Sequence, residues 1–367
     1  MKQNLKSIIL SKVKDDLLNI ETALCENLNP CLTLVSDIAG HLLFSGGKRL
    51  RPLLMVLSSR LCGYRGGDEI KFSTIFEYLH AATLLHDDVV DGANMRRGKP
   101  SAHFKWNVSE VVLTGDFLLA RSLSIASMTK IPELIEIIAK ITEDMSQGEI
   151  EQLDRIGDIN LTEKEYMEVI RRKTAVLIQG ACKSGAILAF GRDMGSFSGM
   201  VHDAASDFGR DDSSVSFHLS TNDLNSNLKS DPWEKEKALN NYGYHLGMAF
   251  QMADDLLDYT ADAESMGKNP GTDIREGKLT LPLIITLAKA EKQDRARIEK
   301  IIKASSFSNK EFIDLTAMLY KYKGIEYTES KAHNHVEKAK ASLDIFKQSK
   351  SKDVMMMLAD YAVARKV

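Results

Sequence analysis

The feature that most constrains the fold is a helical spacing of apolar residues that persists along almost the whole chain. Apolar side chains recur at intervals of three and four residues, which places them on one face of an α-helix. The segments with this spacing are 4–27, 31–44, 50–62, 70–91, 108–128, 132–153, 162–190, 235–259, 279–304 and 308–322. Alternating β-branched runs, which are typical of strands, are few. The sequence therefore predicts an all-α fold, a single large bundle of helices.

Local signals support this prediction and mark one exception. In "LTEKEY", Thr162 followed three residues later by Glu165 predicts a capping box. Pro282 in "TLPLIITLAKA" is expected in the first turn of a helix, where its missing N–H costs little. The stretch 193–231 is rich in Ser, Asp, Asn and Gly and has no sustained apolar face. We interpret it as a polar loop or insertion within one domain spanning 1–367, because the helical pattern resumes on both sides.

Composition excludes several classes of protein. The net charge of -3 over 367 residues gives no global field to attract nucleic acid. No run of about 18 apolar residues is present, so no membrane span is expected. The N-terminus resembles neither a signal peptide nor a transit peptide, which favours a cytoplasmic location. The cysteines lack paired spacing, which argues against a zinc site or a disulfide framework. They are Cys25, Cys31, Cys62 and Cys182.

The segment "LLHDDVVDGANMRRG" places three aspartates directly after an apolar helical run. Asp87 and Asp91 are one helical turn apart and point the same way, with Asp88 beside them. In a partly dry site, unpaired charges of this kind cost several kcal/mol. A solvated acidic face is the simpler interpretation, but the apolar run before the motif counts against it. A hard cation such as Mg²⁺, which takes carboxylate and phosphate oxygens, resolves the repulsion.

A second acidic segment, "AFQMADDLLDY", repeats this pattern with Asp254, Asp255 and Asp258. One such motif is weak evidence, whereas two on separate helices are hard to dismiss. Two facing acidic clusters can hold several Mg²⁺ ions around one polyphosphate.

Basic residues gather in the same parts of the sequence. "GGKRLRP" places cations beside a glycine pair that lets backbone amides approach an anion. Any one of these cations could be a solvated surface charge, the usual state of Lys and Arg. Together they suggest two anionic sites, one bridged by Mg²⁺ and one bound directly. The basic residues are Lys48, Arg49, Arg51, Arg96, Arg97, Lys173 (next to Thr174), Lys268 and Lys278.

At this point the chain resembles a known family. "GGKRLRP", "LLHDDVVDGANMRRG", "GDFLLARS", "RKTAVLI", "FQMADDLLDY" and "GTDIREGKLTLP" occur in the order typical of trans-isoprenyl diphosphate synthases, in particular long-chain polyprenyl diphosphate synthases of the octaprenyl type. The resemblance runs from about residue 10 to 365, interrupted only at 193–231. It implies the helical isoprenoid-synthase fold, with the active-site cavity between the helices. It also implies head-to-tail condensation of isopentenyl diphosphate with an allylic diphosphate, dependent on Mg²⁺, for which Mn²⁺ can substitute.

The resemblance also assigns roles to individual residues. The implied metal ligands are Asp87, Asp88, Asp91, Asp254, Asp255 and Asp258. The implied partners of the allylic diphosphate are Arg96, Lys173 and Lys268, and those of isopentenyl diphosphate are Lys48, Arg51, His80 and Arg97. Thr174 and Gln251 match positions that line the reacting carbon, and Lys278 belongs to a stretch that closes over the diphosphates. The catalytic set is then Lys173, Thr174, Gln251, Asp87 and Asp254.

Small residues in the helix before the first acidic motif give an indication of product length. Positions four and five before Asp87 are Thr83 and Ala82, next to Ala81. Short-chain members usually carry aromatic residues there, so we expect a tunnel and a product longer than geranylgeranyl diphosphate, consistent with a quinone side chain. The candidate floors of this tunnel are Phe76, Tyr78, Phe117, Leu118 and Arg121.

Four alternatives remain open from the sequence: a short-chain (farnesyl or geranylgeranyl) synthase, a non-catalytic partner subunit of a heteromeric synthase, a class I terpene cyclase, and a purely structural helical bundle. The intact acidic motifs and the intact "GGKRLRP" count against the last three. The family resemblance further implies a homodimer.

Overall fold

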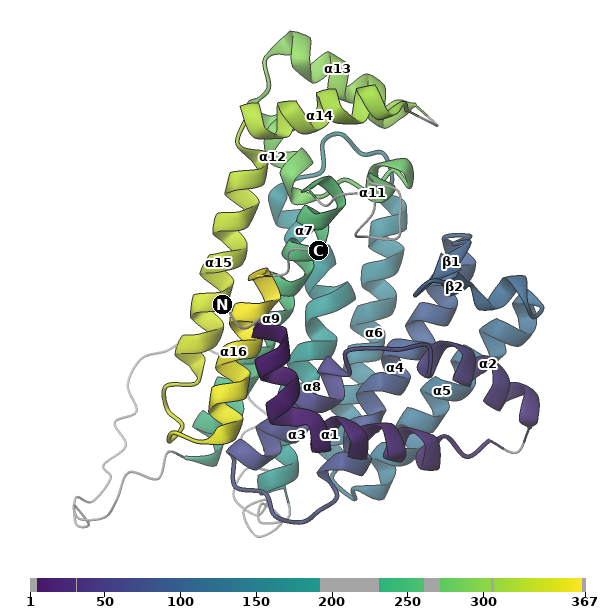
Figure 1. Cartoon of the computed structure of the whole chain (residues 1–367), viewed down its shortest axis with the longest axis vertical. Coiled ribbons are helices and arrows are strands. Elements are labelled where there is room, and N and C mark those ends of the chain that lie inside the picture. The colour runs from purple at the N-terminus through teal and green to yellow at the C-terminus, as the bar shows by residue number, and fades with distance from the viewer. Residues whose placement is uncertain (1–4, 31, 192–230, 261–270, 305–306, 365–367) are drawn as a thin grey trace, which may run out of the picture.

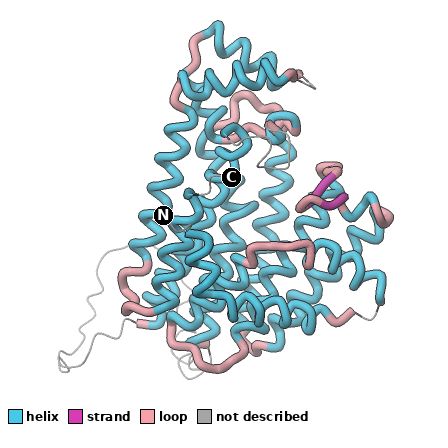
Figure 2. The backbone as a smooth tube through the Cα atoms, viewed as in Figure 1, coloured by secondary structure: helices cyan, strands magenta, loops and turns pink. Residues whose placement is uncertain are grey.

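The computed structural model describes residues 5–30, 32–191, 231–260, 271–304 and 307–364. Within these ranges the chain is almost entirely helical (Figure 2). The only strands there, β1 (Met95–Arg96) and β2 (Lys99–Pro100), form one short antiparallel hairpin. The all-α prediction is therefore confirmed. The predicted insertion lies outside the described residues, apart from its last residue, Asp231.

The elements follow one another without a sheet to organise them. The first half contains α1 (Leu5–Leu28), α2 (Thr33–Leu43), α3 (Leu50–Leu61), α4 (Glu69–Val90), η1 (Ala102–Phe104), α5 (Val108–Met128), α6 (Pro132–Asp154), α7 (Glu163–Ile170), η2 (Arg171–Ala175) and α8 (Val176–Phe190). The second half contains α9 (Pro232–Thr260), α11 (Thr272–Arg275), α12 (Leu281–Lys289), α13 (Lys292–Lys303), α14 (Asn309–Lys321), α15 (Gly324–Ser342) and α16 (Lys350–Ala364).

Both local helix signals are confirmed. The Glu165 amide donates to the Thr162 hydroxyl at 3.3 Å, and the Glu165 carboxylate accepts from the Thr162 amide at 2.9 Å. Pro282 lies in the first turn of α12. A capping box and an N-terminal proline depend only on neighbouring residues, so the sequence is sufficient to reveal them.

Two predicted segments are not single α-helices. The segment 162–190 contains the π-helical turn η2 between α7 and α8, and 279–304 divides into α12 and α13. At that break, Arg295 donates to the Leu287 carbonyl at 3.0 Å and the Tyr322 hydroxyl accepts from the Glu291 amide at 3.2 Å. These contacts join residues eight and 31 positions apart through specific polar groups, so apolar periodicity does not reveal them. Helices α15 and α16 were not predicted at all.

The helix α9 connects the two hydrophobic clusters of the structure. Tyr242 and Leu246 belong to a larger cluster formed with α1, α3, α4, α5, α8 and α16. Met252 and Leu256 belong to a second cluster formed with α12, α13, α14 and α15. Figure 1 shows α13 and α14 at the end of the molecule opposite α1. Because α9 also carries the second acidic motif, both clusters fix the position of that motif.

A close approach of backbones brings α9 against η2. A Cβ at Gly247 would lie 2.5 Å from the Ala175 Cα, so only glycine allows this distance. Helices α8 and α9 pack extensively, as do α4 and α5. The residues of "RKTAVLI" and "FQMADDLLDY" are thus held side by side.

Arg49 ties the first helices together. Its side chain is almost fully buried and donates to Glu21 and Glu77 at 2.6 Å each, and to the Leu43 carbonyl. These partners belong to α1, α4 and the end of α2. Arg49 therefore has a structural role that differs from that of the other cations in "GGKRLRP".

No helix in the described part of the chain combines the length and the apolar character needed to cross a bilayer.

Replacing Arg49 should destabilise the fold strongly. Arg49→Ala leaves Glu77, which is 4% exposed, buried without its cation. We expect the free energy of unfolding to fall by about 3 kcal/mol, measured by urea denaturation. The control Lys140→Ala removes an ion pair in which both side chains are 62% exposed, and it should leave stability unchanged within error. Equal stability of the two variants would contradict this role of Arg49.

Candidate active site

The first acidic motif lies where α4 ends and faces α6 and η2. Burial raises the pKa of Asp87 to about 6, and the negative charges of Glu149 and Asp91 act in the same direction. The positive charges of Lys173 and Arg96 oppose this rise. The structure therefore brings Asp87 and Asp91 together, as predicted, and adds Glu149 to them.

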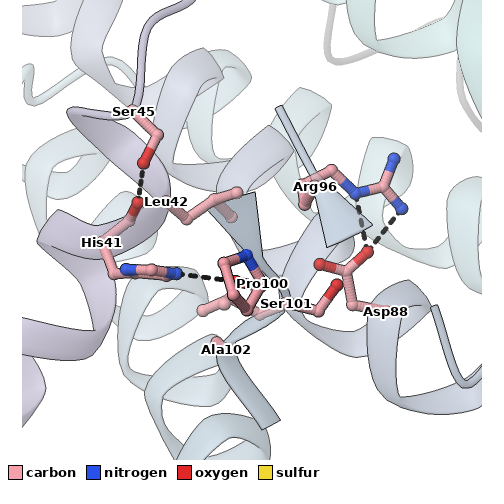
Figure 3. Close-up of a pocket in the computed structure, with 9 residues that line it drawn as sticks. His41, Leu42, Ser45, Asp88, Arg96, Pro100, Ser101 and Ala102 are labelled. Carbon is pink, nitrogen blue, oxygen red and sulfur yellow. Dashed lines mark hydrogen bonds and ion pairs between the residues drawn. The ribbon is translucent and has the colours of Figure 1, made fainter. Parts of the chain in front are cut away.

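Asp88 has different surroundings. Its carboxylate is 1% exposed and accepts from the Arg96 Nε at 2.7 Å (Figure 3). The pair lines a small pocket between α2, α4 and the hairpin, together with His41 and Ser101. The Ser101 hydroxyl in this pocket is buried without a hydrogen-bond partner. The sequence predicted a metal ion as the partner of Asp88 and the allylic diphosphate as the partner of Arg96, but in the structure the two side chains bind each other.

A basic cluster lies beside the acidic one. Arg51, His80 and Arg97 are close enough to affect each other's charge. Burial lowers the pKa of His80 well below its ordinary value, and Arg51 and Arg97 lower it further, so the imidazole is neutral. The Arg51 Nε is buried without a hydrogen-bond partner; burial lowers the pKa of Arg51, and the negative charges of Glu77 and Asp254 oppose this. The arrangement suits an anion.

Arg97 is also held by backbone carbonyls, and the remaining members of the predicted basic set are more dispersed. Arg97 donates to the Leu42 carbonyl at 3.2 Å and to the Gly46 carbonyl. Lys48 is exposed, with its Nζ 5.7 Å from the ring centre of Tyr361 on α16. Lys268 lies outside the described residues.

A chain of hydrogen bonds joins η2 to α9 and α7. The Thr174 hydroxyl donates to the Gln251 carbonyl oxygen at 2.7 Å, and the Gln251 amide donates to Asp255 at 2.7 Å. The Tyr166 hydroxyl donates to the other Asp255 oxygen at 2.5 Å. Burial raises the pKa of Asp255 to about 7. The structure thus places Thr174 and Gln251 together, and it engages Asp255 with protein groups.

Lys173 projects from the π-helical turn into the same polar cavity. Its Nζ contacts Glu149 at 2.6 Å and donates to Gln152 at 2.7 Å. The cavity is also lined by Gln251, Asp255 and other polar residues. A π-helical turn redirects side chains at the cost of one poorly bonded residue, and such turns are frequent at functional sites.

Lys278 links the region after the second acidic motif to the first. Its Nζ lies 3.1 Å from both oxygens of Asp91 and 2.8 Å from Glu276. Burial opposes its charge, but Glu276 and Asp91 raise the pKa of Lys278 to about 12. Asp258 is 8% exposed and accepts from two backbone amides of α11.

Sequence reasoning missed several polar residues of this site, among them Glu149, Gln152, Tyr166 and Asp273. A signal existed for the first two. Leu134, Ile138 and Ile141 lie on the inward stripe of α6, and Glu149 and Gln152 continue it at helical spacing. Polar residues on such a stripe indicate a buried polar site.

The side chains present fit a divalent cation and a diphosphate. The Glu149 Oε1 is buried without a hydrogen-bond partner, close to Asp87 and Asp91, where repulsion between carboxylates favours a cation. The unpartnered Arg51 Nε fits a phosphate oxygen in the same way. In the described part of the chain, no three acidic, histidine or cysteine side chains converge into a ready metal cluster. The metal ligands therefore stay a prediction.

Comparison with known proteins decides the family. The model of the family described as polyprenyl synthetase matches residues 33–211 and 210–319. The chain belongs to the polyprenyl synthetase family. It is 32% identical over 367 residues to an octaprenyl diphosphate synthase of Haemophilus influenzae, covering 99% of each chain. It is 30% identical to a short chain isoprenyl diphosphate synthase of Methanothermobacter thermautotrophicus, covering 89% of this chain and 88% of the relative.

A solved structure supports the same assignment. The polyprenyl synthase of Caulobacter crescentus, complexed with calcium and isoprenyl diphosphate, superimposes with a TM-score of 0.82 at 32% identity, covering 100% of this chain and 99% of that one. This polyprenyl synthetase is accordingly a trans-prenyltransferase with the helical isoprenoid-synthase fold. The terpene cyclase and the purely structural bundle are set aside.

The raised pKa of Asp87 predicts how stability depends on pH. The folded carboxyl titrates near pH 6 and the unfolded one near pH 4, so the folded state binds more protons between them. In EDTA, the free energy of unfolding should therefore fall as the pH rises from about 4 to about 6, by at most about 3 kcal/mol. Asp87→Asn should remove this part of the pH dependence, measured by urea denaturation. An identical pH profile for the variant would refute the assignment.

Proposed function

We propose that this polyprenyl synthetase condenses isopentenyl diphosphate with geranyl, farnesyl or geranylgeranyl diphosphate, head to tail and with Mg²⁺, to give a long all-trans polyprenyl diphosphate for a quinone side chain. We further propose that the chain is a single domain, forms a homodimer and works in the cytoplasm. The short-chain synthase remains the second candidate, because a short-chain relative is 30% identical.

The observation that carries this proposal is the pairing of each acidic motif with a cation from a distant segment. The Lys278 Nζ lies 3.1 Å from Asp91, and the negative charge of Asp254, together with that of Glu77, favours the charged form of the buried Arg51. Carboxylates and cations that alternate around one site can hold a polyanion and its metal ions, since each group meets an opposite charge. Neither a membrane surface nor nucleic acid requires such an enclosed arrangement.

The surroundings of the six aspartates suggest which of them would hold Mg²⁺. Asp88, Asp255 and Asp258 are engaged by Arg96, by Tyr166 with Gln251, and by backbone amides, respectively. The ligands we propose are Asp87 and Asp91, where repulsion between carboxylates favours a cation although Lys278 also contacts Asp91, and Asp254, with Asp88, Asp255 and Asp258 supporting them. When bound, the ions neutralise the negative charge that develops on the leaving diphosphate.

The chain's own groups then act on the diphosphates. Arg96 and Lys173 hold the allylic diphosphate, with Lys268 as a further predicted partner, and their fixed charges stabilise the leaving group as the allylic C–O bond breaks. Lys48, Arg51, His80 and Arg97 hold isopentenyl diphosphate. Its double bond attacks the allylic cation, and the departing diphosphate takes the proton that is lost. The Thr174 and Gln251 oxygens face the cation and stabilise it electrostatically.

The activity is tested with purified protein, Mg²⁺, labelled isopentenyl diphosphate and a farnesyl or geranyl primer. We expect chain elongation, and a loss of about a hundredfold in kcat/KM for Lys173→Ala, because a preorganised cation is removed. The control Lys183→Ala removes a cation of α8 that pairs with Glu236 on α9 outside the cavity, and it should keep full activity. Elongation that is absent, or independent of Lys173, would refute the proposal.

The contacts of the candidate floor residues favour one of them as the floor of the proposed product tunnel. Phe76 lies on the Asp87 face of α4, about 16 Å along the helix. It is fully buried next to Gly180 of α8, where Ile141 of α6 also packs. Tyr78, in contrast, donates to the Leu24 carbonyl of α1 at 2.6 Å. Arg121 bonds to the Asn27 carbonyl, also at the end of α1. Phe76 is therefore our preferred floor.

Product length should respond to these residues in opposite directions. Phe76→Leu opens the floor and should shift the product to longer chains, whereas Ala82→Phe should shorten it. Tyr78→Phe removes only the hydroxyl that bonds to α1 and should leave the product unchanged. Mass spectrometry of the dephosphorylated products measures all three. An unchanged product for both Phe76→Leu and Ala82→Phe would refute a tunnel along α4.

A further inference from the structure

The three aspartates of the second acidic motif have three different surroundings. Asp254 acts on the charge of Arg51, and Asp255 accepts from Tyr166 and Gln251. Asp258 has a contact of another kind, because it accepts backbone N–H groups of α11. The repeat in the sequence therefore does not correspond to a repeat in function.

The helix α11 has no capping side chain of its own. Its first amides need acceptors, as at every helix start, but its N-cap residue is Gly271. Asp258 supplies these acceptors from the last turn of α9. Its Oδ1 accepts from the Thr272 amide and its Oδ2 from the Asp273 amide, both at 3.0 Å. Its backbone carbonyl accepts from the Gly271 amide, also at 3.0 Å.

The geometry at Gly271 explains why the cap comes from a distant residue. Gly271 has φ +76°, a region that other residues rarely adopt. A Cβ there would lie 2.6 Å from the Phe312 ring. On the same side, the Arg275 guanidinium lies 4.0 Å from the ring centre of Phe307. A local Ser, Asp or Asn cap is sterically excluded, so α11 depends on Asp258.

The position of α11 in turn fixes Lys278. The Lys278 amide donates to the Asp273 carbonyl at 2.7 Å, and the Gly277 carbonyl accepts from the Gly157 amide at 2.8 Å. From this turn the Lys278 side chain reaches Asp91 at 3.1 Å. A continuous series of contacts thus leads from Asp258, through α11, to the first acidic motif.

We infer that Asp258 is a positioning residue that caps α11 from α9. Through α11 it holds the Lys278 ammonium at the first acidic motif. This role replaces the metal-ligand role that its sequence motif suggests. This inference rests on the proposed function for its effect on catalysis. The capping contact itself does not depend on that function, so the two can be tested apart.

The structural arm compares amide hydrogen exchange in the full chain, in EDTA, for the wild type, Asp258→Ala and Asp258→Asn. Loss of a cap should speed exchange at the Thr272 and Asp273 amides by about fivefold in Asp258→Ala. Asparagine is a good cap with one carbonyl acceptor, so Asp258→Asn should keep protection at one of the two amides. Unchanged exchange in α4 and α8 shows that the variants are folded. Wild-type protection at both amides in Asp258→Ala would overturn the inference.

The kinetic arm measures the Mg²⁺ concentration for half-maximal activity and the KM for the allylic diphosphate. Asp258→Ala should raise this KM by about tenfold, because Lys278 is misplaced. The KM of Asp258→Asn should lie between those of the wild type and Asp258→Ala. The Mg²⁺ requirement of Asp258→Ala should stay within about twofold of the wild-type value. The comparison variant Asp254→Asn should raise the Mg²⁺ requirement instead. A Mg²⁺ requirement in Asp258→Asn that rises as far as in Asp254→Asn would overturn the inference. An inactive wild type would refute the proposed function. Hydrogen exchange at the Thr272 and Asp273 amides would then still decide whether Asp258 caps α11.

Discussion

Repulsion between carboxylates at the ends of two helices is the constraint on which the rest of the site depends. Burial raises the pKa of Asp87, and the negative charges of Glu149 and Asp91 act in the same direction. The structure balances them with cations from distant segments, Lys173 from η2 and Lys278 from the turn after α11. Each ammonium group forms an ion pair with one of these carboxylates, so the protein itself offsets part of the repulsion in the absence of substrate.

The helical scaffold makes these charges effective. Because α9 passes through both hydrophobic clusters, the second acidic motif cannot move independently of either. The glycine at 247 brings α9 against η2, and the hydrogen bonds from Thr174 through Gln251 to Asp255 fix the facing side chains. Fixed dipoles and charges in a place with little water stabilise developing charge better than mobile water does. A rigid apolar interior therefore serves an almost purely electrostatic site.

The two acidic motifs look equivalent in sequence but differ in their neighbours. Asp88 pairs with Arg96 beside the hairpin, and Asp255 accepts from Tyr166 and Gln251. Asp258 accepts from the first amides of a short helix. A carboxylate can bind a metal ion, an arginine or a backbone amide, and the residue type does not distinguish these partners. Each motif thus contains carboxylates that other protein groups engage, beside those that we propose as metal ligands.

What the sequence determined was the all-α class, the family and most of the residue types of the site. Apolar spacing gave the all-α fold, and the ordered motifs carried the resemblance that the family comparison confirmed. Tertiary structure alone decided which aspartate meets which partner, that η2 is a π-helical turn, and that Tyr166 and Asp273 join the site. The physical reason is that periodicity and capping depend on neighbours a few residues away. An ion pair such as Lys278 with Asp91 joins segments far apart in the chain, and only the packing of whole helices brings them within reach.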